Sequence, residues 1–165
     1  MSIHHRRITF FVLTLSYDPS SAIQAARSQI GVQYAWGGGH GATPGKTRGT
    51  CEWYEGPPYP CVDDQVVGYD CSGLVRYAVW VGSGQAIDLG HSGNTNMQYS
   101  DSHSHKITAD QRQPGDLVFY GTPGNTHHVA LYIGNDRMIE ARESLKPVME
   151  SPLRTNSALW VRIVQ

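Results

Sequence analysis

The fold class is set by residues 113–133, which read QPGDLVFYGTPGNTHHVALYI. Two apolar runs are separated by a turn-rich stretch at 121–125, so this stretch predicts two strands joined by a short connection. The pattern predicts four strands in this half of the chain, at 116–120, 127–133, 137–142 and 159–164. Connections this short are typical of antiparallel strands, because parallel strands need a long crossover.

Helical periodicity comes before the strands. Asp18-Pro19 is a typical helix start, and apolar residues recur at helical spacing from there until Gly31. A second helix is expected from about Cys71 to Val81, and a short one near 95–99. Helices early and strands late predict an α+β fold with an antiparallel sheet, not a parallel α/β fold.

The length of 165 residues is room for one domain. Residues 1–17 are interpreted as an N-terminal arm or strand, and 18–165 as a single domain with an insertion over 40–69. The net charge of −1 provides no strong field toward nucleic acid or anionic lipid. No apolar run approaches the roughly 18 residues of a membrane span.

Two of the three cysteines, Cys51 and Cys61, lie in a segment that has little periodicity from 32 to 69. Such a long irregular segment is either functional or disordered. A bridge between the two cysteines closes a loop rich in proline and adds about 2–3 kcal/mol of stability. We therefore expect a Cys51–Cys61 disulfide and an oxidising compartment. The alternative is two reduced cysteines in a cytosolic loop.

The third cysteine, Cys71, opens the predicted second helix directly after Asp70. The N–H groups of a first helical turn have no partner within the helix, and with the helix dipole they lower the pKa of a nearby thiol. This position predicts a nucleophilic thiolate at neutral pH. The alternative is a buried structural cysteine without a chemical role.

The best candidate for a base is His128, in the strand predicted over 127–133. Side chains alternate along a strand, so Ala130 shares the face of His128 and leaves room for a helix to approach. If 134–136 form a three-residue turn, Glu140 lies on the same face, where a carboxylate orients the imidazole. A two-residue turn places Glu140 on the other face. The combination fits a Cys–His–Glu triad.

Four ordered motifs resemble those of the NlpC-type cysteine peptidases of bacterial cell-wall turnover, a family of the papain-like clan. They are Tyr34-Ala35-Trp36-Gly37-Gly38, Asp70-Cys71-Ser72-Gly73-Leu74-Val75, residues 113–120 and residues 128–134, with 137–141 following. The resemblance covers about residues 20–164 and implies a papain-like fold, with the nucleophile at a helix N-terminus packed on an antiparallel sheet. It implies that Cys71 is the nucleophile, His128 the general base and Glu140 the orienting residue.

The same resemblance implies a substrate site that includes Tyr34 and Asp70, and we expect their neighbours Trp36 and Ser72 to bind substrate as well. The chain departs from the family pattern in two respects. The insertion over 40–69 is longer than the usual link, and no cell-wall anchoring repeat accompanies the domain.

The function implied by the resemblance is that of a peptidoglycan endopeptidase. It cuts stem peptides between D-γ-glutamate and the following diamino acid, through a thioester acyl-enzyme. We expect a secreted or extracellular monomer that needs no metal or organic cofactor. Three alternatives stay open: a papain-like amidase or acyltransferase, a non-catalytic wall-binding module, and a Cys/His zinc site.

Overall fold

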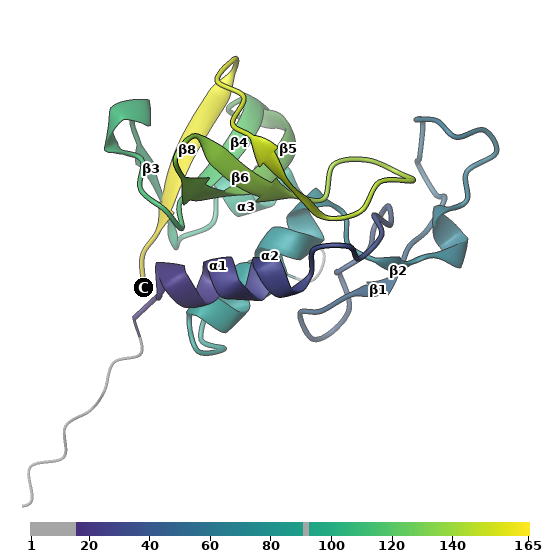
Figure 1. Ribbon diagram of the computed structural model, residues 1–165, viewed down its shortest axis with the longest axis horizontal. Coiled ribbons are helices and arrows are strands. Elements are labelled where there is room, and N and C mark those ends of the chain that lie inside the picture. Colours follow the sequence, from purple (N-terminus) through teal and green to yellow (C-terminus); the bar gives the residue numbers. More distant parts are fainter. Residues whose placement is uncertain (1–15, 91–92) are drawn as a thin grey trace, which may run out of the picture.

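An antiparallel sheet forms the centre of the structure, a computed structural model that describes residues 16–90 and 93–165 (Figure 1). Its strands are β3 (Ser104–Ile107), β4 (Leu117–Thr122), β5 (Asn125–Gly134), β6 (Arg137–Glu140), β7 (Met149–Pro152) and β8 (Ala158–Ile163). Their order in space is β3-β8-β4-β5-β6-β7, and every neighbouring pair is antiparallel. The predicted α+β class is confirmed.

The helices are α1 (Pro19–Ser28), α2 (Cys71–Gly82) and the short α3 (Thr95–Tyr99). Each begins at a residue whose side chain accepts a hydrogen bond from a backbone N–H of the first turn, namely Asp18, Asp70 and Asn94. All three helices lie where the sequence predicts them. Helices α1 and α2 lie side by side along one face of the sheet (Figure 1).

The sheet buries apolar side chains on both faces, and alternation along each strand separates the two sets. The face toward α1 and α2 carries Leu117, Phe119, Val129, Leu131, Ile139 and Val161. The other face carries a smaller cluster of Val118, Tyr120, Ala130, Tyr132, Met138 and Trp160. Ala130 thus points away from the helices, so the expectation that it makes room for one is wrong.

The edge strands β3 and β7 are absent from the strands that the sequence predicts. Each has four residues and few buried ones, because an edge strand of this sheet needs little apolar alternation. Their pairing partners, β8 and β6, supply the hydrogen bonds that define them. Sequence periodicity therefore misses elements that exist only through tertiary pairing.

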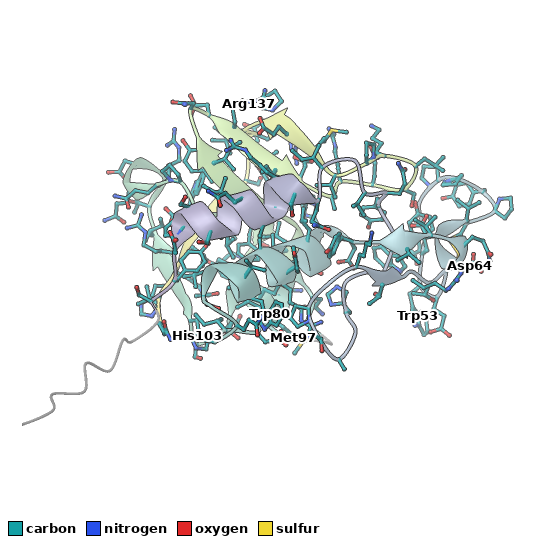
Figure 2. All side chains as sticks on the ribbon, turned by 60° about the horizontal axis from the view of Figure 1, so that its bottom comes forward. Trp53, Asp64, Trp80, Met97, His103 and Arg137 are labelled. Atoms are coloured by element: carbon teal, nitrogen blue, oxygen red, sulfur yellow. A yellow bond between two sulfur atoms is a disulfide. The ribbon has the colours of Figure 1, made fainter. Side chains whose placement is uncertain are left out.

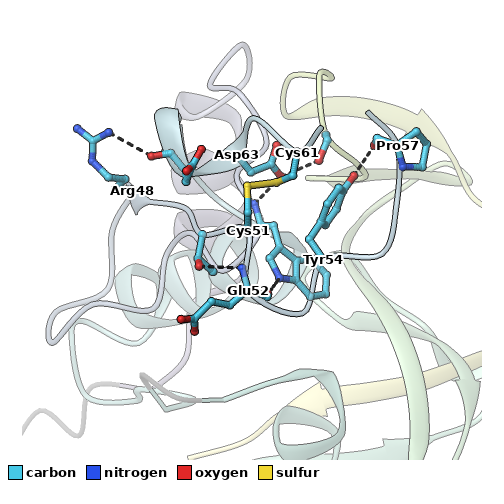
Figure 3. Close-up of a disulfide and its surroundings, with 11 residues drawn as sticks. Arg48, Cys51, Glu52, Tyr54, Pro57, Cys61 and Asp63 are labelled. Atoms are coloured by element: carbon cyan, nitrogen blue, oxygen red, sulfur yellow. Dashed lines mark hydrogen bonds between the residues drawn. A yellow bond between two sulfur atoms is a disulfide. The ribbon is translucent and has the colours of Figure 1, made fainter. Parts of the chain in front are cut away.

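Between α1 and α2 the chain extends to one side of the helices (Figure 1). This segment contains the paired strands β1 (Thr47–Arg48) and β2 (Val67–Gly68), and one turn of 3-10 helix, η1 (Asp63–Gln65). A second turn of 3-10 helix, η2 (Ala109–Gln111), precedes β4. The predicted disulfide is confirmed: Cys51 and Cys61 are bonded and close a loop of the extended segment (Figure 3).

The arm or strand predicted over 1–17 lies almost wholly outside the described residues, which begin at 16. In the part of the chain that the structure describes, no helix has both the length and the apolar character that crossing a membrane requires.

Candidate active site

Cys71 is the first residue of α2, and Asp70 is the N-cap of this helix. The Asp70 carboxylate accepts a hydrogen bond of 2.7 Å from the backbone N–H of Gly73. The backbone N–H of Asp70 donates in turn to the carbonyl of Gly38, at 3.0 Å. Loop and helix approach so closely that a Cβ on Gly73 would lie 2.1 Å from the Gly38 oxygen. Glycine at these positions therefore holds the first motif against the N-terminus of α2.

The helix N-terminus does not produce the thiolate that the sequence predicts. Burial raises the pKa of the Cys71 thiol to about 12, and the Asp70 carboxylate adds to the rise. Backbone hydrogen bonds from Val129, Ser72 and Cys71 itself lower the pKa but are outweighed. The expectation of a lowered thiol pKa is wrong, because desolvation of the sulfur exceeds the effect of the helix terminus. The pKa of the Cys71 thiol therefore lies above its ordinary value.

His128 lies on β5 and Glu140 at the end of β6, with the imidazole Nε2 3.6 Å from the carboxylate Oε1. The turn between these strands has two residues, 135–136, not the three that the predicted register assumes. A bulge between Tyr132 and Gly134 adds the extra residue on β5. Glu140 therefore lies beside His128 on one face, as the sequence predicts, although the turn differs.

The Glu140 side chain is fully buried and receives two hydrogen bonds from Arg154, of 2.9 Å and 3.2 Å. Burial acts to raise the pKa of Glu140, but the interactions with His128 and Arg154 outweigh it, so the pKa is lowered. The Tyr120 ring stacks on the His128 ring at 5.8 Å, and the Arg154 guanidinium lies 4.9 Å from the Tyr120 ring. Arg154 thus holds the Glu140 carboxylate through hydrogen bonds, and Tyr120 holds the His128 imidazole through ring stacking.

Cys71 and His128 line one pocket of about 680 Å³ at the N-terminal end of α2. The four residues predicted to bind substrate line it as well, namely Tyr34, Trp36, Asp70 and Ser72. His127 and Arg142 form part of the wall, and so do Thr50, Glu52 and Trp53 of the extended segment. The fold therefore brings every predicted substrate-binding residue to the thiol, while Glu140 lies behind the imidazole.

Asp70 and Ser72 are engaged within the protein. Asp70 Oδ1 accepts a hydrogen bond of 3.0 Å from the Ser72 hydroxyl and lies 2.8 Å from Nε2 of His40. Its Oδ2 accepts a hydrogen bond of 3.2 Å from the N–H of Gly37. The two side chains shape the pocket floor next to Cys71, and a direct contact with substrate stays a prediction.

Tyr34 and Trp36 contribute the aromatic part of the pocket. Tyr34 is buried, and burial raises the pKa of its phenol, so its hydroxyl group stays protonated. The Trp36 indole N–H donates to the Glu52 carbonyl at 2.9 Å, and its ring lies 5.6 Å from the Tyr54 ring. Trp36 therefore couples the pocket floor to the disulfide loop.

Three polar residues at the site were missed by the sequence interpretation: His40, Arg142 and Arg154. His40 and Arg154 lie in irregular segments, where no periodicity indicates a direction for the side chain. Arg142 ends the strand predicted over 137–142, and alternation from Glu140 could have placed it on the same face. Among residues 16–90 and 93–165, no three His, Cys, Asp or Glu side chains gather as a set of metal ligands.

An α+β frame with a helix-borne cysteine and a strand-borne histidine beside one pocket is typical of the papain-like clan. Within this clan, the chain belongs to the NlpC/P60 family, which matches residues 31–161. The predicted family is therefore confirmed.

Two curated relatives carry the same domain. Peptidoglycan endopeptidase RipA of Mycolicibacterium smegmatis is 39% identical over 136 residues, which are 81% of this chain and 23% of RipA. Peptidoglycan endopeptidase RipB of Mycobacterium tuberculosis is 42% identical over 134 residues, 80% of this chain and 46% of RipB. The chain thus spans less than half of the length of either relative.

Solved structures show the same fold. The peptidoglycan hydrolase RipB of M. tuberculosis has a TM-score of 0.69 at 34% identity, covering 89% of this chain and 65% of that one. RipD of M. tuberculosis has a TM-score of 0.67 at 35% identity, covering 87% and 95%, and is described as a non-catalytic NlpC/p60 domain protein adapted to peptidoglycan binding. RipA has been solved with mutations at a cysteine, at a histidine and at a glutamate.

Proposed function

We propose that this chain is a cysteine endopeptidase that hydrolyses peptidoglycan stem peptides at the bond between D-γ-glutamate and the diamino acid. The decisive observation is that Cys71 and His128 share one pocket, with Glu140 3.6 Å from the imidazole. The relatives named peptidoglycan endopeptidases support the substrate class. The mutated histidine and glutamate of RipA lie twelve positions apart, as His128 and Glu140 do, which supports the triad.

The proposed chemistry assigns one ring nitrogen of His128 to each neighbour in the triad. Nε2 of His128 faces Glu140, which leaves Nδ1 to accept the thiol proton of Cys71. Because burial raises the thiol pKa, the reaction needs a base to take this proton, and His128 is the proposed base. The backbone N–H of Cys71 stabilises the oxyanion at the helix N-terminus. His128 then protonates the leaving amine, and a water molecule activated by His128 hydrolyses the thioester.

The proposal also covers the extent of the catalytic domain and the location of the protein. Residues 18–165 form a single catalytic domain that carries 40–69 as an insertion and acts as a monomer on peptidoglycan or its stem peptides. The Cys51–Cys61 disulfide supports a secreted or extracellular location, because such bonds persist in oxidising compartments.

The test is fragment release from purified peptidoglycans of the diaminopimelate and lysine types, followed by mass spectrometry. We expect the wild type to release fragments cut after D-γ-glutamate. Cys71→Ala and His128→Ala abolish release, whereas the neighbouring His127→Ala loses far less activity. Fragments that retain the D-γ-glutamyl bond would contradict the proposed bond, and a dead His127→Ala beside an active His128→Ala would contradict the assignment of the base.

The second candidate function is peptidoglycan binding without turnover, which the description of RipD favours. In that case the wild type and Cys71→Ala bind insoluble peptidoglycan equally well and neither releases fragments. Both outcomes are read from one co-sedimentation experiment, with mass spectrometry of the supernatant.

A further inference from the structure

Trp53 is the most exposed large apolar side chain of the described residues, with 90% of its surface accessible. Its backbone has a φ of 60°, in the left-handed region that residues other than glycine rarely adopt. Both the exposure and the backbone conformation cost free energy. A backbone held in a rarely populated conformation is often found at ligand-binding sites.

The loop around Trp53 is held in place on both sides. The Cys51–Cys61 disulfide closes the loop, and the N–H of Glu52 donates to the Thr50 hydroxyl at 3.1 Å (Figure 3). The Glu52 carbonyl accepts the indole N–H of Trp36. Trp53 therefore projects from a fixed backbone within the extended segment (Figure 2). An aromatic side chain on a fixed support binds with little loss of conformational entropy.

Trp53 also lies at the edge of the active-site pocket. It lines the same pocket as Cys71, together with Glu52. The pocket lining therefore includes a negatively charged side chain, Glu52, next to Trp53, and a positively charged side chain, Arg142. A long substrate whose peptide fills the pocket must continue along its edge, and Trp53 offers an exposed aromatic surface there.

We propose that Trp53 is a platform for the glycan strand of peptidoglycan, on which one sugar ring stacks while the attached stem peptide occupies the pocket. This assignment rests on the proposed function and deepens it, because it makes glycan-linked peptide the preferred substrate. The apolar C–H face of a sugar ring matches the face of an indole, and the polar edge of the sugar stays in water.

Charge next to Trp53 favours a neutral glycan over other occupants. The exposed carboxylates of Glu52 and Glu55 flank it and accept hydrogen bonds from sugar hydroxyl groups. The same carboxylates repel the headgroups of anionic lipids. Arg142, on the wall of the same pocket, lies 4.0 Å from Glu140 and 3.9 Å from Glu143, so its charge is already partly compensated within the protein.

The experiment compares two substrates from one preparation: soluble glycan strands that carry stem peptides, and the free stem peptides. We expect Trp53→Ala to lower the ratio of kcat/KM for the glycan-linked substrate to that for the free peptide about fivefold, mainly through KM. Trp53→Phe restores most of the ratio. Tyr59→Ala is the matched control, because Tyr59 is 75% exposed on the same disulfide loop but lies outside the pocket lining. It leaves the ratio unchanged.

Measuring the affinity for glycan in an inactive variant tests the role of Trp53 separately from the proposed peptidase activity. In a Cys71→Ala background, affinity for neutral chitin oligosaccharides, which carry the same β-1,4-linked N-acetylglucosamine rings, is expected to fall about fivefold on adding Trp53→Ala. A wild type that hydrolyses neither substrate would refute the peptidase function, and the glycan affinity would still test the platform. The platform is overturned if Trp53→Ala slows both substrates equally, leaves glycan affinity unchanged, or weakens binding to phosphatidylglycerol vesicles and not to glycan.

Discussion

Replacing Glu140 by Gln removes a buried negative charge and leaves the size of the side chain almost unchanged. Glu140 is fully buried, lies 3.6 Å from the His128 ring and receives two hydrogen bonds from Arg154. A Gln in this place keeps an acceptor oxygen for the imidazole, so the orientation of His128 survives. What is lost is the charge that stabilises the imidazolium formed during attack.

The size of the loss follows from the three neighbours of the carboxylate: His128, Arg154 and, at 4.0 Å, Arg142. Two unit charges 3.6 Å apart interact by about 4–5 kcal/mol at an effective dielectric constant of about 20. Arg154 compensates a large part of the carboxylate charge, so only a fraction of this energy acts on His128. We expect a loss of about 1.4–2.7 kcal/mol of transition-state stabilisation, or about ten- to hundredfold in kcat/KM.

The assay is kcat/KM on a soluble stem-peptide fragment, with the thermal midpoint of each variant measured in parallel. Glu143→Gln is the matched control, because it removes the same charge from a half-exposed side chain that pairs with Lys146. Wild-type activity in Glu140→Gln would refute the role of Glu140 in the triad. A loss of activity that tracks a loss of fold would assign Glu140 to stability through Arg154 instead.

Further predictions concern the cysteines and the pH dependence of stability. Denatured, unreduced protein should show one titratable thiol, from Cys71, and reduction should expose three; three thiols before reduction would contradict the disulfide. Replacing Cys51 and Cys61 by Ser should lower the unfolding free energy by about 2–3 kcal/mol in urea denaturation, while free-peptide hydrolysis at low temperature largely survives. Because the pKa of Cys71 is raised, its alkylation by iodoacetamide should still accelerate above pH 9, and a plateau below pH 8.5 would show a preformed thiolate. Because the pKa of Glu140 is lowered by folding, its contribution to stability is full above the unfolded pKa and is lost as pH falls through the folded value, so stability should fall more steeply from pH 6 to pH 3 in the wild type than in Glu140→Gln.

The sequence predicts the parts of this structure that depend on local patterns. Caps such as Asp18 and Asp70 mark where helices begin, and short apolar runs bounded by turn residues mark β4 and β5. The cysteine at a helix start and the histidine on a strand follow from the same local rules. These rules place the chemistry on elements that the fold then brings together.

The features of the structure that the sequence does not predict are those that depend on tertiary contacts. The bulge between Tyr132 and Gly134 compensates for a two-residue turn, and no short motif predicts both at once. Arg154 reaches Glu140 from an irregular connection, so its role is visible only in three dimensions. The Cys71 pKa moves opposite to the prediction, because burial of the sulfur depends on residues that pack around it from distant segments.

The order of the strands has a consequence for biosynthesis. β8 is the last strand along the chain, yet it lies inside the sheet, between β3 and β4. Arg154, which donates hydrogen bonds to Glu140, lies in the connection between β7 and β8. A nascent chain that has not yet released residues 154–163 from the ribosome therefore has neither a closed sheet nor an anchored Glu140. The proposed hydrolysis therefore requires the last strand of the domain, so the order of synthesis itself delays the completion of the candidate site.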